Sequence, residues 1–142
     1  MNDEQGKSVS IIRSTPETTR NGPTDYFTGD VKIAAPFGPD DPSRVQGATV
    51  SFEKGARTAW HTHPFGQLLI VTAGSGYVQK QGDDAQPMHQ GDIVWIPAHV
   101  KHWHGAAPDT PMTHVAVQEH LDGTAVEWLE KVTDEEYAEA TK

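Results

Sequence analysis

Short runs of apolar residues, many alternating with polar ones, follow one another along the chain and are separated by glycine and proline. Alternation with a period of two is typical of β-strands, whose successive side chains point to opposite faces of a sheet. We expect strands over residues 9–12, 25–33, 45–52, 58–63, 67–73, 77–81, 92–96, 102–106 and 112–119. Turns or loops are expected at residues 15–24, 34–42, 74–76 and 82–84. Short strands at this spacing indicate a β-sandwich or barrel.

Only the last part of the chain has a helical pattern. Thr133 followed by Glu136 is a capping-box sequence, which predicts a short helix through Tyr137 and Ala140. Residues 126–129 are expected to form one further helical turn. The length of 142 residues fits one domain, which we divide into an N-terminal tail and edge segment, 1–24, and a β-domain, 25–142. The prediction is therefore an all-β domain with a short C-terminal helix.

Composition narrows the possible functions. The chain contains no cysteine, which excludes disulfides, thiolate nucleophiles and cysteine-ligated metals. Its formal net charge of −9 disfavours binding to nucleic acid or to anionic lipid, both of which need clustered lysine and arginine. No apolar run approaches the roughly 20 residues that span a membrane, and the N-terminus lacks the apolar core of a secretory signal. We therefore expect a cytoplasmic protein whose partner is a small molecule.

Histidine is the residue with the most informative placement. His61 and His63 lie two apart on one predicted strand, and His102 and His104 repeat this spacing on a later strand. Both members of each pair should therefore face the same side of the sheet. A single histidine is usually a hydrogen-bonded core or surface residue, but burying several imidazoles together without a metal would be costly. With Gln67, which follows a tight connection, His61, His63 and His102 predict a site for a divalent first-row metal.

Two spaced motifs around these residues resemble those of the cupin family. The first cupin motif has the order Gly, His-X-His, Glu and Gly, and the second has Gly, Pro-X-Gly, His and Asn. The matching positions are Gly55, His61, His63, Gln67 and Gly74, then Gly91, Pro97, His99, His102 and Ala106. Every spacing fits, and the departures are Gln67 for Glu, His99 for Gly and Ala106 for Asn. The resemblance implies a double-stranded β-helix jelly roll that binds a metal and forms homo-oligomers, dimers or larger.

The glutamine in the first motif changes the charge of the expected site. A carboxylate ligand would offset one charge of a divalent ion, whereas the amide of Gln67 offsets none. The ion would then be a stronger Lewis acid toward an anionic ligand. Oxygen and imidazole ligands suit Mn(II) or Fe(II), and Zn(II), Ni(II) and Co(II) stay open as alternatives.

A narrower resemblance covers most of the chain from about Gly22. Residues 26–29, 59–64, 66–67, 101–108, 112–114, 118–119, 121–123 and 132–137 are similar to the bacterial cupin hydroxynitrile lyases. These enzymes cleave cyanohydrins such as mandelonitrile into an aldehyde and cyanide. The resemblance implies an (R)-selective lyase in which His61, His63, Gln67 and His102 hold Mn(II). It also implies that His104 and His114 lie beside the substrate.

Three residues receive roles in the implied reaction. His114 is our preferred general base, because its strand parity places it with the apolar Met112 and Ala116. The alternative for His114 is a hydrogen-bonding role behind the metal ligands. His104 or Lys101 would stabilise the anionic leaving group. The choice between His104 and His114 as the base stays open, as do the physiological substrate and the oligomer size.

The same ligand set leaves two other functions open. One is an Fe(II)-dependent dioxygenase acting on a small molecule, and the other is a non-enzymatic module that binds a ligand through its metal. The metal found after purification and the consumption of oxygen would separate these functions. Outside the site, we expect Trp60 and Trp103 in barrel packing, Trp95 and Trp128 in the core or an interface, and Arg57 in a surface ion pair.

Overall fold

The strands of the chain form one curled sheet in a computed structural model that describes residues 8–142. The first seven residues of the expected N-terminal tail lie outside this description. The strands are β1 (Arg20–Asn21), β2 (Phe27–Thr28), β3 (Val31–Phe37), β4 (Val45–Phe52), β5 (Arg57–Thr58), β6 (His61–Thr62), β7 (Gln67–Lys80), β8 (Gln86–His89), β9 (Ile93–Ile96), β10 (His102–Ala106), β11 (Met112–Glu119) and β12 (Glu127–Trp128). The 3-10 helix η2 (Pro16–Thr18) precedes them and helix α1 (Asp134–Ala140) follows them. Within residues 8–142, no helix is long and apolar enough to cross a membrane.

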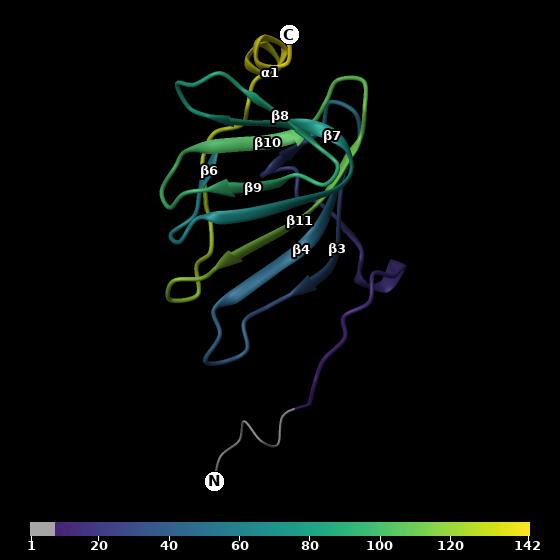
Figure 1. The fold of residues 1–142 in the computed structure, drawn as a ribbon, viewed down its shortest axis with the longest axis vertical. Coiled ribbons are helices and arrows are strands. Elements are labelled where there is room, and N and C mark those ends of the chain that lie inside the picture. The colour runs from purple at the N-terminus through teal and green to yellow at the C-terminus, as the bar shows by residue number, and fades with distance from the viewer. Residues whose placement is uncertain (1–7) are drawn as a thin grey trace.

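Antiparallel pairing carries the chain around the barrel in the order β1-β3-β4-β11-β7-β10-β5-β2. The long strand β7 joins two groups of strands. Its first part pairs with β11 and β9, and its second part pairs with β10 and β8. Strand β6 lies between β10 and β12. Figure 1 shows β3, β4 and β11 curling below the upper strands, with α1 at the top and the N-terminal segment leading away from the barrel.

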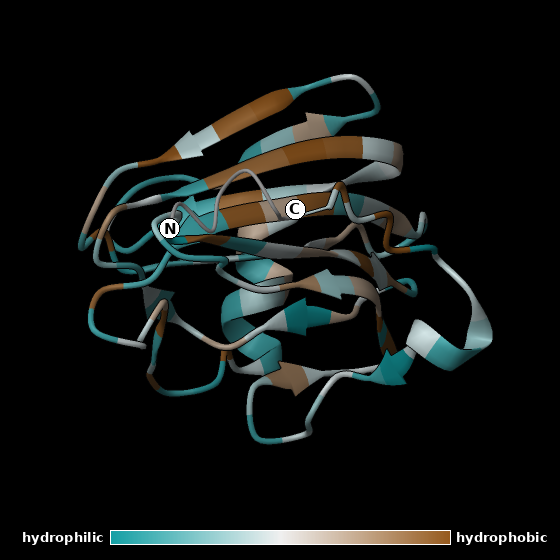
Figure 2. Cartoon of the chain, turned by 90° about the horizontal axis from the view of Figure 1, so that it is seen from below, coloured by the Kyte–Doolittle hydropathy of each residue, from teal (hydrophilic) through white to brown (hydrophobic). Residues whose placement is uncertain are grey.

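Rows of cross-strand partners define the inner face of the barrel. Ile33, Val50 and His114 are direct partners on β3, β4 and β11, and Ala48 pairs with Ala116 in the adjacent row of inward-facing residues. Direct partners in antiparallel strands place their side chains on the same face. The main core contains Phe27, Val31, Ile33, Val50, Phe52, Leu69, Val71, Met88, Ile96 and Met112. Figure 2 shows that the most hydrophobic stretches of the chain lie in the strands.

Helix α1 is capped as predicted and packs on the barrel. Thr133 accepts a hydrogen bond from the Glu136 amide, and the Glu136 carboxylate accepts one from the Thr133 amide. The Tyr137 hydroxyl donates to the buried carbonyl of Ala106 at 2.6 Å. A second core cluster consists of Trp60, Trp103, Val132 and Tyr137. The structural role expected for Trp60 and Trp103 is therefore confirmed.

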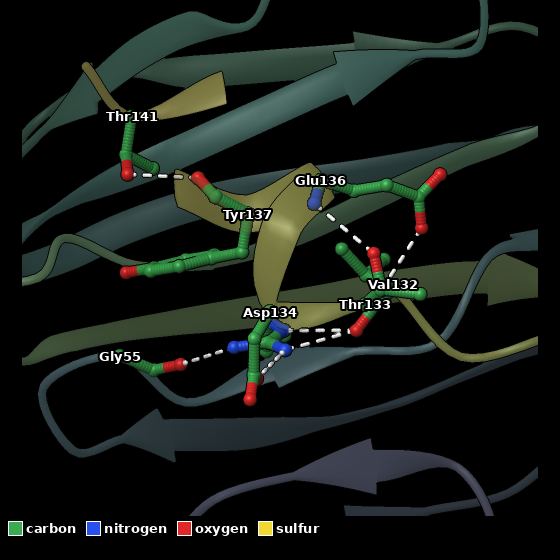
Figure 3. Close-up of polar contacts among 8 residues, drawn as sticks. Gly55, Val132, Thr133, Asp134, Glu136, Tyr137 and Thr141 are labelled. Carbon is green, nitrogen blue, oxygen red and sulfur yellow. Dashed lines mark hydrogen bonds and ion pairs between the residues drawn. The ribbon is translucent and has the colours of Figure 1, made fainter. Parts of the chain in front are cut away.

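Arg57 forms an ion pair, but it is buried rather than at the surface, with 5% of its area exposed. Its guanidinium donates to the Val132 carbonyl at 2.9 Å and to the Asp134 carboxylate at 2.7 Å, and it lies 4.7 Å from the centre of the Tyr137 ring. Figure 3 shows these contacts together with the Gly55 carbonyl. The surface position predicted for Arg57 was wrong because the C-terminal segment, distant in sequence, covers strand β5.

The predicted turn at residues 74–76 was wrong, because these residues continue strand β7. Gly74 has a φ of +71° inside the strand, and a Cβ atom at this position would lie 1.8 Å from the Pro111 carbonyl oxygen. The register with β11 shifts two residues earlier in β7, where Thr72 is the extra residue between the partners of Thr113 and His114. Gly74 itself permits a close approach of two backbones, not a chain reversal.

Other observed strand boundaries differ from the predicted ones because they depend on which strands pair. Residues 9–12 form no strand although they lie in the described part of the chain, and Val9 and Ile11 are exposed. The expected strand 25–33 is divided into β2 and β3, and β3 continues to Phe37 into the expected loop. Residues 127–128 form strand β12 on β6 instead of a helical turn, and β8 was not predicted. Local alternation does not show which distant strand is available as a partner.

Candidate metal centre

Strand pairing brings the two histidine pairs of the sequence together. His61 on β6 and His102 on β10 are direct cross-strand partners, and their ring centres lie 4.2 Å apart. Gly66, with a φ of +83°, completes the turn that returns the chain from His63 to Gln67 at the start of β7. All four predicted metal ligands are buried, with at most 5% of their area exposed. The structure therefore gathers His61, His63, Gln67 and His102 inside the barrel, as their spacing predicted.

Backbone carbonyls orient the three predicted histidine ligands in the same way. Each ring uses Nδ1 to contact a carbonyl oxygen: His61 to Ala59 at 2.9 Å, His63 to Ala125 at 2.7 Å and His102 to Val100 at 2.9 Å. A carbonyl only accepts hydrogen bonds, so each Nδ1 carries the proton and each Nε2 keeps its lone pair. This arrangement of the outer hydrogen bonds is typical of histidines that bind a metal.

Gln67 presents its oxygen to the histidines. Its Nε2 donates to the Gln118 side-chain oxygen at 3.0 Å, and its Oε1 lies 3.4 Å from His102 Nε2. The bond to Gln118 therefore fixes which end of the amide faces the site. Imidazole nitrogens with one amide oxygen form a donor set that suits a divalent first-row metal.

The free ring nitrogens fit a bound ion. His61, His102 and His104 each offer a nitrogen within 4.8 Å of the others, so these three buried histidines could hold a metal. His63 lies outside this closest group, yet its Nε2 is buried without a hydrogen-bond partner, as is His104 Nε2. A buried unpartnered nitrogen is costly unless something else binds it. His104, unlike His63, uses its Nδ1 to contact another imidazole.

His104 and His114 form a hydrogen-bonded pair next to this group. His114 Nε2 lies 3.1 Å from His104 Nδ1, and Phe52 packs against both rings. The Nδ1 of His114 is buried without a partner. Both side chains face the barrel interior, in agreement with the parity inferred from the sequence. The structure thus brings His104 and His114 together at the predicted site.

Burial keeps the imidazoles neutral. Desolvation lowers the pKa of His102 and of His114 to about 4. Desolvation, followed by the nearby His102 and His63 rings, also places the pKa of His61 well below its usual value. The pKa of His104 is likewise well below its usual value through burial and then the neighbouring His114. Neutral imidazole is the form that binds a metal or accepts a proton.

Lys101 lies elsewhere. Its ammonium forms a 2.6 Å ion pair with Glu130 and lies 5.6 Å from the centre of a Trp60 ring. Because Lys101 precedes the inward-facing His102, its side chain takes the opposite face of the chain. Lys101 is not among the described residues that line the cavity at the site. The role assigned to Lys101 from the sequence therefore has no support in the geometry.

A cavity of about 240 Å³ opens beside the histidines. Its apolar walls include Phe27, Ile33, Val50, Phe52, Ala116 and Trp128. Trp128 packs against the main core, as expected, and strand β12 also places it opposite His61, with the ring centres 4.7 Å apart. Phe27 and Trp128 were missed as site residues because they come from segments far from both motifs. Residues 26–29 belong to the narrower resemblance, but no local pattern marks Phe27 or Trp128 as a site residue, because each reaches the site through pairing with a distant strand.

Comparisons with known proteins agree with this architecture. The model of the cupin domain family matches residues 48–118. A protein named (R)-mandelonitrile lyase, from Granulicella tundricola, is 56% identical over 91% of this chain and 98% of its own length. The structure of a cupin-like protein from Thermotoga maritima, 41% identical, covers 94% of this chain and 98% of its own with a TM-score of 0.82. A cupin barrel protein from Rhodopseudomonas palustris, 16% identical with a TM-score of 0.63, shares the fold over 85% of this chain and 81% of its own.

Proposed function

Because the chain belongs to the cupin family, as its two motifs predicted, we propose that it is a metal-dependent carbon–carbon lyase acting on cyanohydrins. The observation that carries this proposal is the hydrogen-bonded pair of buried histidines, His104 and His114, beside a donor set that fits a metal. The apolar cavity suits an aromatic substrate. The 56% identity to a protein named (R)-mandelonitrile lyase supports the same substrate class and (R) stereochemistry.

The metal site in this proposal consists of His61, His63, Gln67 and His102. Their Nδ1 contacts and the Gln67–Gln118 hydrogen bond leave three imidazole nitrogens and one amide oxygen for the ion. We propose Mn(II), the metal that the resemblance to the cupin hydroxynitrile lyases implies. When bound, such an ion would supply Lewis acidity toward the substrate oxygen.

The hydrogen bond between His114 Nε2 and His104 Nδ1 links the protonation of the two rings. Each neutral imidazole carries one N–H, so this contact admits two tautomeric arrangements. When His114 Nε2 donates, His114 Nδ1 is a free acceptor and His104 Nε2 carries a proton. When His104 Nδ1 donates, these roles are reversed. One ring is therefore a proton acceptor while the other is a donor, which is what a reversible proton transfer requires.

In the cleavage direction we assign the acceptor role to His114. His114 Nδ1 takes the hydroxyl proton, the carbonyl forms, and the carbon–carbon bond breaks with its electron pair on cyanide. His114, now protonated on both nitrogens, gives its Nε2 proton to His104 Nδ1, while His104 Nε2 gives its own proton to cyanide to release HCN. The pair ends in the opposite tautomer, which is the starting arrangement for cyanohydrin synthesis.

The test combines metal analysis with a cleavage assay. Protein purified without chelator or added metal should contain stoichiometric divalent metal and release benzaldehyde from mandelonitrile without consuming oxygen. Oxygen uptake with a chelating substrate would support the dioxygenase alternative instead. A metal-replete protein that neither cleaves nor forms cyanohydrins would contradict the proposed function.

The proposal also includes assembly into a homo-oligomer. Ile93 and Trp95 on strand β9 are 71% and 59% exposed, which is unusual for large apolar side chains. Burying them against a second copy would remove this apolar surface from water. Sedimentation equilibrium should therefore give a mass above that of one chain, and Trp95→Glu should reduce it.

A further inference from the structure

The cavity contains a charged residue that the proposed reaction does not use. Among the described residues that line the cavity, Arg20 alone carries a full charge at neutral pH. Within residues 8–142, the ion pairs join other residues, so no carboxylate of this part of the chain neutralises Arg20. The chain has a net charge of −9, so the positive charge of Arg20 at the cavity is opposite in sign to the net charge of the protein.

Strand register places Arg20 on the same inner-facing row as His114. Arg20 on β1 is the direct partner of Ile33, Ile33 is the partner of Val50, and Val50 is the partner of His114. Residues in such a row project from the same face of the sheet. Three inter-strand spacings of about 4.8 Å separate the two ends of the row, roughly 14 Å along the sheet. The sheet is curled, so the direct path across the cavity is shorter.

The surface between these two ends is apolar. Ile33 and Val50 lie between Arg20 and His114 in the row, and Phe37, which pairs with Gly47, also lines the cavity. Strand β1 is exposed, so the Arg20 end of the cavity contacts solvent. The cavity therefore has a histidine-rich buried end, an apolar middle and a cationic outer end. A molecule that matches all three has a reacting oxygen, a ring, and an anionic group opposite the reacting carbon.

We infer that Arg20 recognises a carboxylate at the far end of the substrate, which makes an acid-substituted aryl cyanohydrin or aldehyde the preferred substrate class. This inference rests on the proposed lyase function. A guanidinium suits the role because its planar fork forms two parallel hydrogen bonds with a carboxylate. The residue is a specificity determinant, since it lies at the opposite end of the row from the histidine that handles the proton.

A binding experiment tests this without turnover. Isothermal titration compares 4-(hydroxymethyl)benzoate with its neutral isostere 4-(hydroxymethyl)benzamide. An ion pair at a solvent-exposed cavity end contributes about fivefold in affinity, so the wild-type protein should bind the acid about fivefold more tightly than the amide. Arg20→Gln should bring this ratio to about one, and added salt should reduce it in the wild type. Arg13→Gln, which removes the same charge from the same N-terminal segment outside the cavity lining, should keep the wild-type ratio.

Each outcome decides the question. If the wild type, Arg20→Gln and Arg13→Gln all have the same acid-to-amide affinity ratio, Arg20 does not bind the carboxylate. A wild type that binds the amide more tightly than the acid would also overturn this role. A wild type that fails to cleave mandelonitrile would contradict the lyase proposal, yet the acid-to-amide binding ratio would still decide whether Arg20 binds a carboxylate. A wild type that cleaves mandelonitrile with a ratio unaffected by Arg20→Gln would overturn the Arg20 inference alone.

Discussion

The backbone carbonyls of Ala59, Ala125 and Val100 define the chemistry of the site as much as the imidazoles do. By accepting hydrogen bonds from Nδ1 they leave the Nε2 atoms of His61, His63 and His102 unprotonated and available to the proposed metal. Sequence spacing predicted which side chains meet, because residues two apart share a face of a strand. It could not predict the tautomer, because the carbonyl of Ala125 is 62 residues away from His63.

The choice between His63 and His104 as a metal ligand is decided by comparing two variants. His63→Ala removes a ring whose Nδ1 is fixed and whose Nε2 is free, so it should abolish stoichiometric metal. His104→Ala removes a ring engaged with His114 and should leave the metal in place. Metal content is measured by elemental analysis, with circular dichroism to check the fold. If His63→Ala keeps the metal and His104→Ala loses it, the ligand is His104 and not His63.

Removal of His114 should separate metal binding from catalysis. His114→Ala should keep the metal and the fold but lose roughly 10²-fold or more in cyanohydrin cleavage, the usual effect of losing a general base. His104→Ala should lose less, because water can supply the proton to cyanide. If the two rings act as one relay, the double variant should be no slower than His114→Ala. Wild-type turnover in both single variants would contradict a histidine base and leave Lewis acidity as the explanation.

At the scale of elements, the sequence predicted the bounds of several strands and the start of the helix. Strands β10 and β11 have the predicted bounds, and helix α1 begins after its predicted cap. Long-range pairing was not predictable: Arg20 falls in the expected loop 15–24 of the N-terminal tail and edge segment, yet it pairs with β3 and lines the cavity. Trp128 lies at the site because β12 pairs with β6, which is also a long-range pairing.

Gly74 offers a test of the misread turn. Its Cβ would lie 1.8 Å from the Pro111 carbonyl oxygen, whereas Gly91, with a φ of +94°, has no heavy atom within 4 Å of the corresponding position. Both alanine variants carry the strain of positive φ, but only Gly74→Ala also forces two backbones apart. We expect Gly91→Ala to lower the free energy of unfolding by about 1 kcal/mol and Gly74→Ala by clearly more. Equal losses in urea denaturation would show that the close approach is unimportant.

The docking of α1 depends on one buried hydroxyl. Tyr137→Phe keeps the ring that packs against Trp103 and Arg57 but leaves the Ala106 carbonyl without its donor. The free energy of unfolding should fall by about 1–2 kcal/mol. Glu135→Gln, an exposed change on the same helix, should stay within about 0.5 kcal/mol of wild type. A Tyr137→Phe variant as stable as wild type would mean that the hydroxyl is not needed to hold the helix.

At the scale of the whole molecule, an excess of negative charge is combined with a barrel interior whose buried imidazoles are neutral. A net charge of −9 opposes compaction through self-repulsion, so mild acidification would by itself favour the folded state. The buried imidazoles act in the opposite direction, since protonating any of them inside the barrel is unfavourable. The two effects predict opposite changes of stability with pH, and their sizes decide which is observed.

The imidazoles should dominate in metal-free protein. Burial lowers the folded pKa of His102 and His114 to about 4, whereas in the unfolded chain each titrates near 6.5. Their full contribution to stability is present above pH 6.5 and is lost as the pH falls toward 4, by about 1.4 kcal/mol per pH unit for each ring. After removal of metal by a chelator, the free energy of unfolding in urea should therefore decrease steeply between pH 7 and pH 5.

Two variants check this pH dependence. His114→Gln removes one buried titratable ring and should make the free energy of unfolding depend less steeply on pH. Val71→Ala destabilises the core without removing a titratable group, so it should lower the free energy of unfolding equally at every pH. A stability that is constant or increases toward pH 5 would show that surface repulsion outweighs the buried histidines.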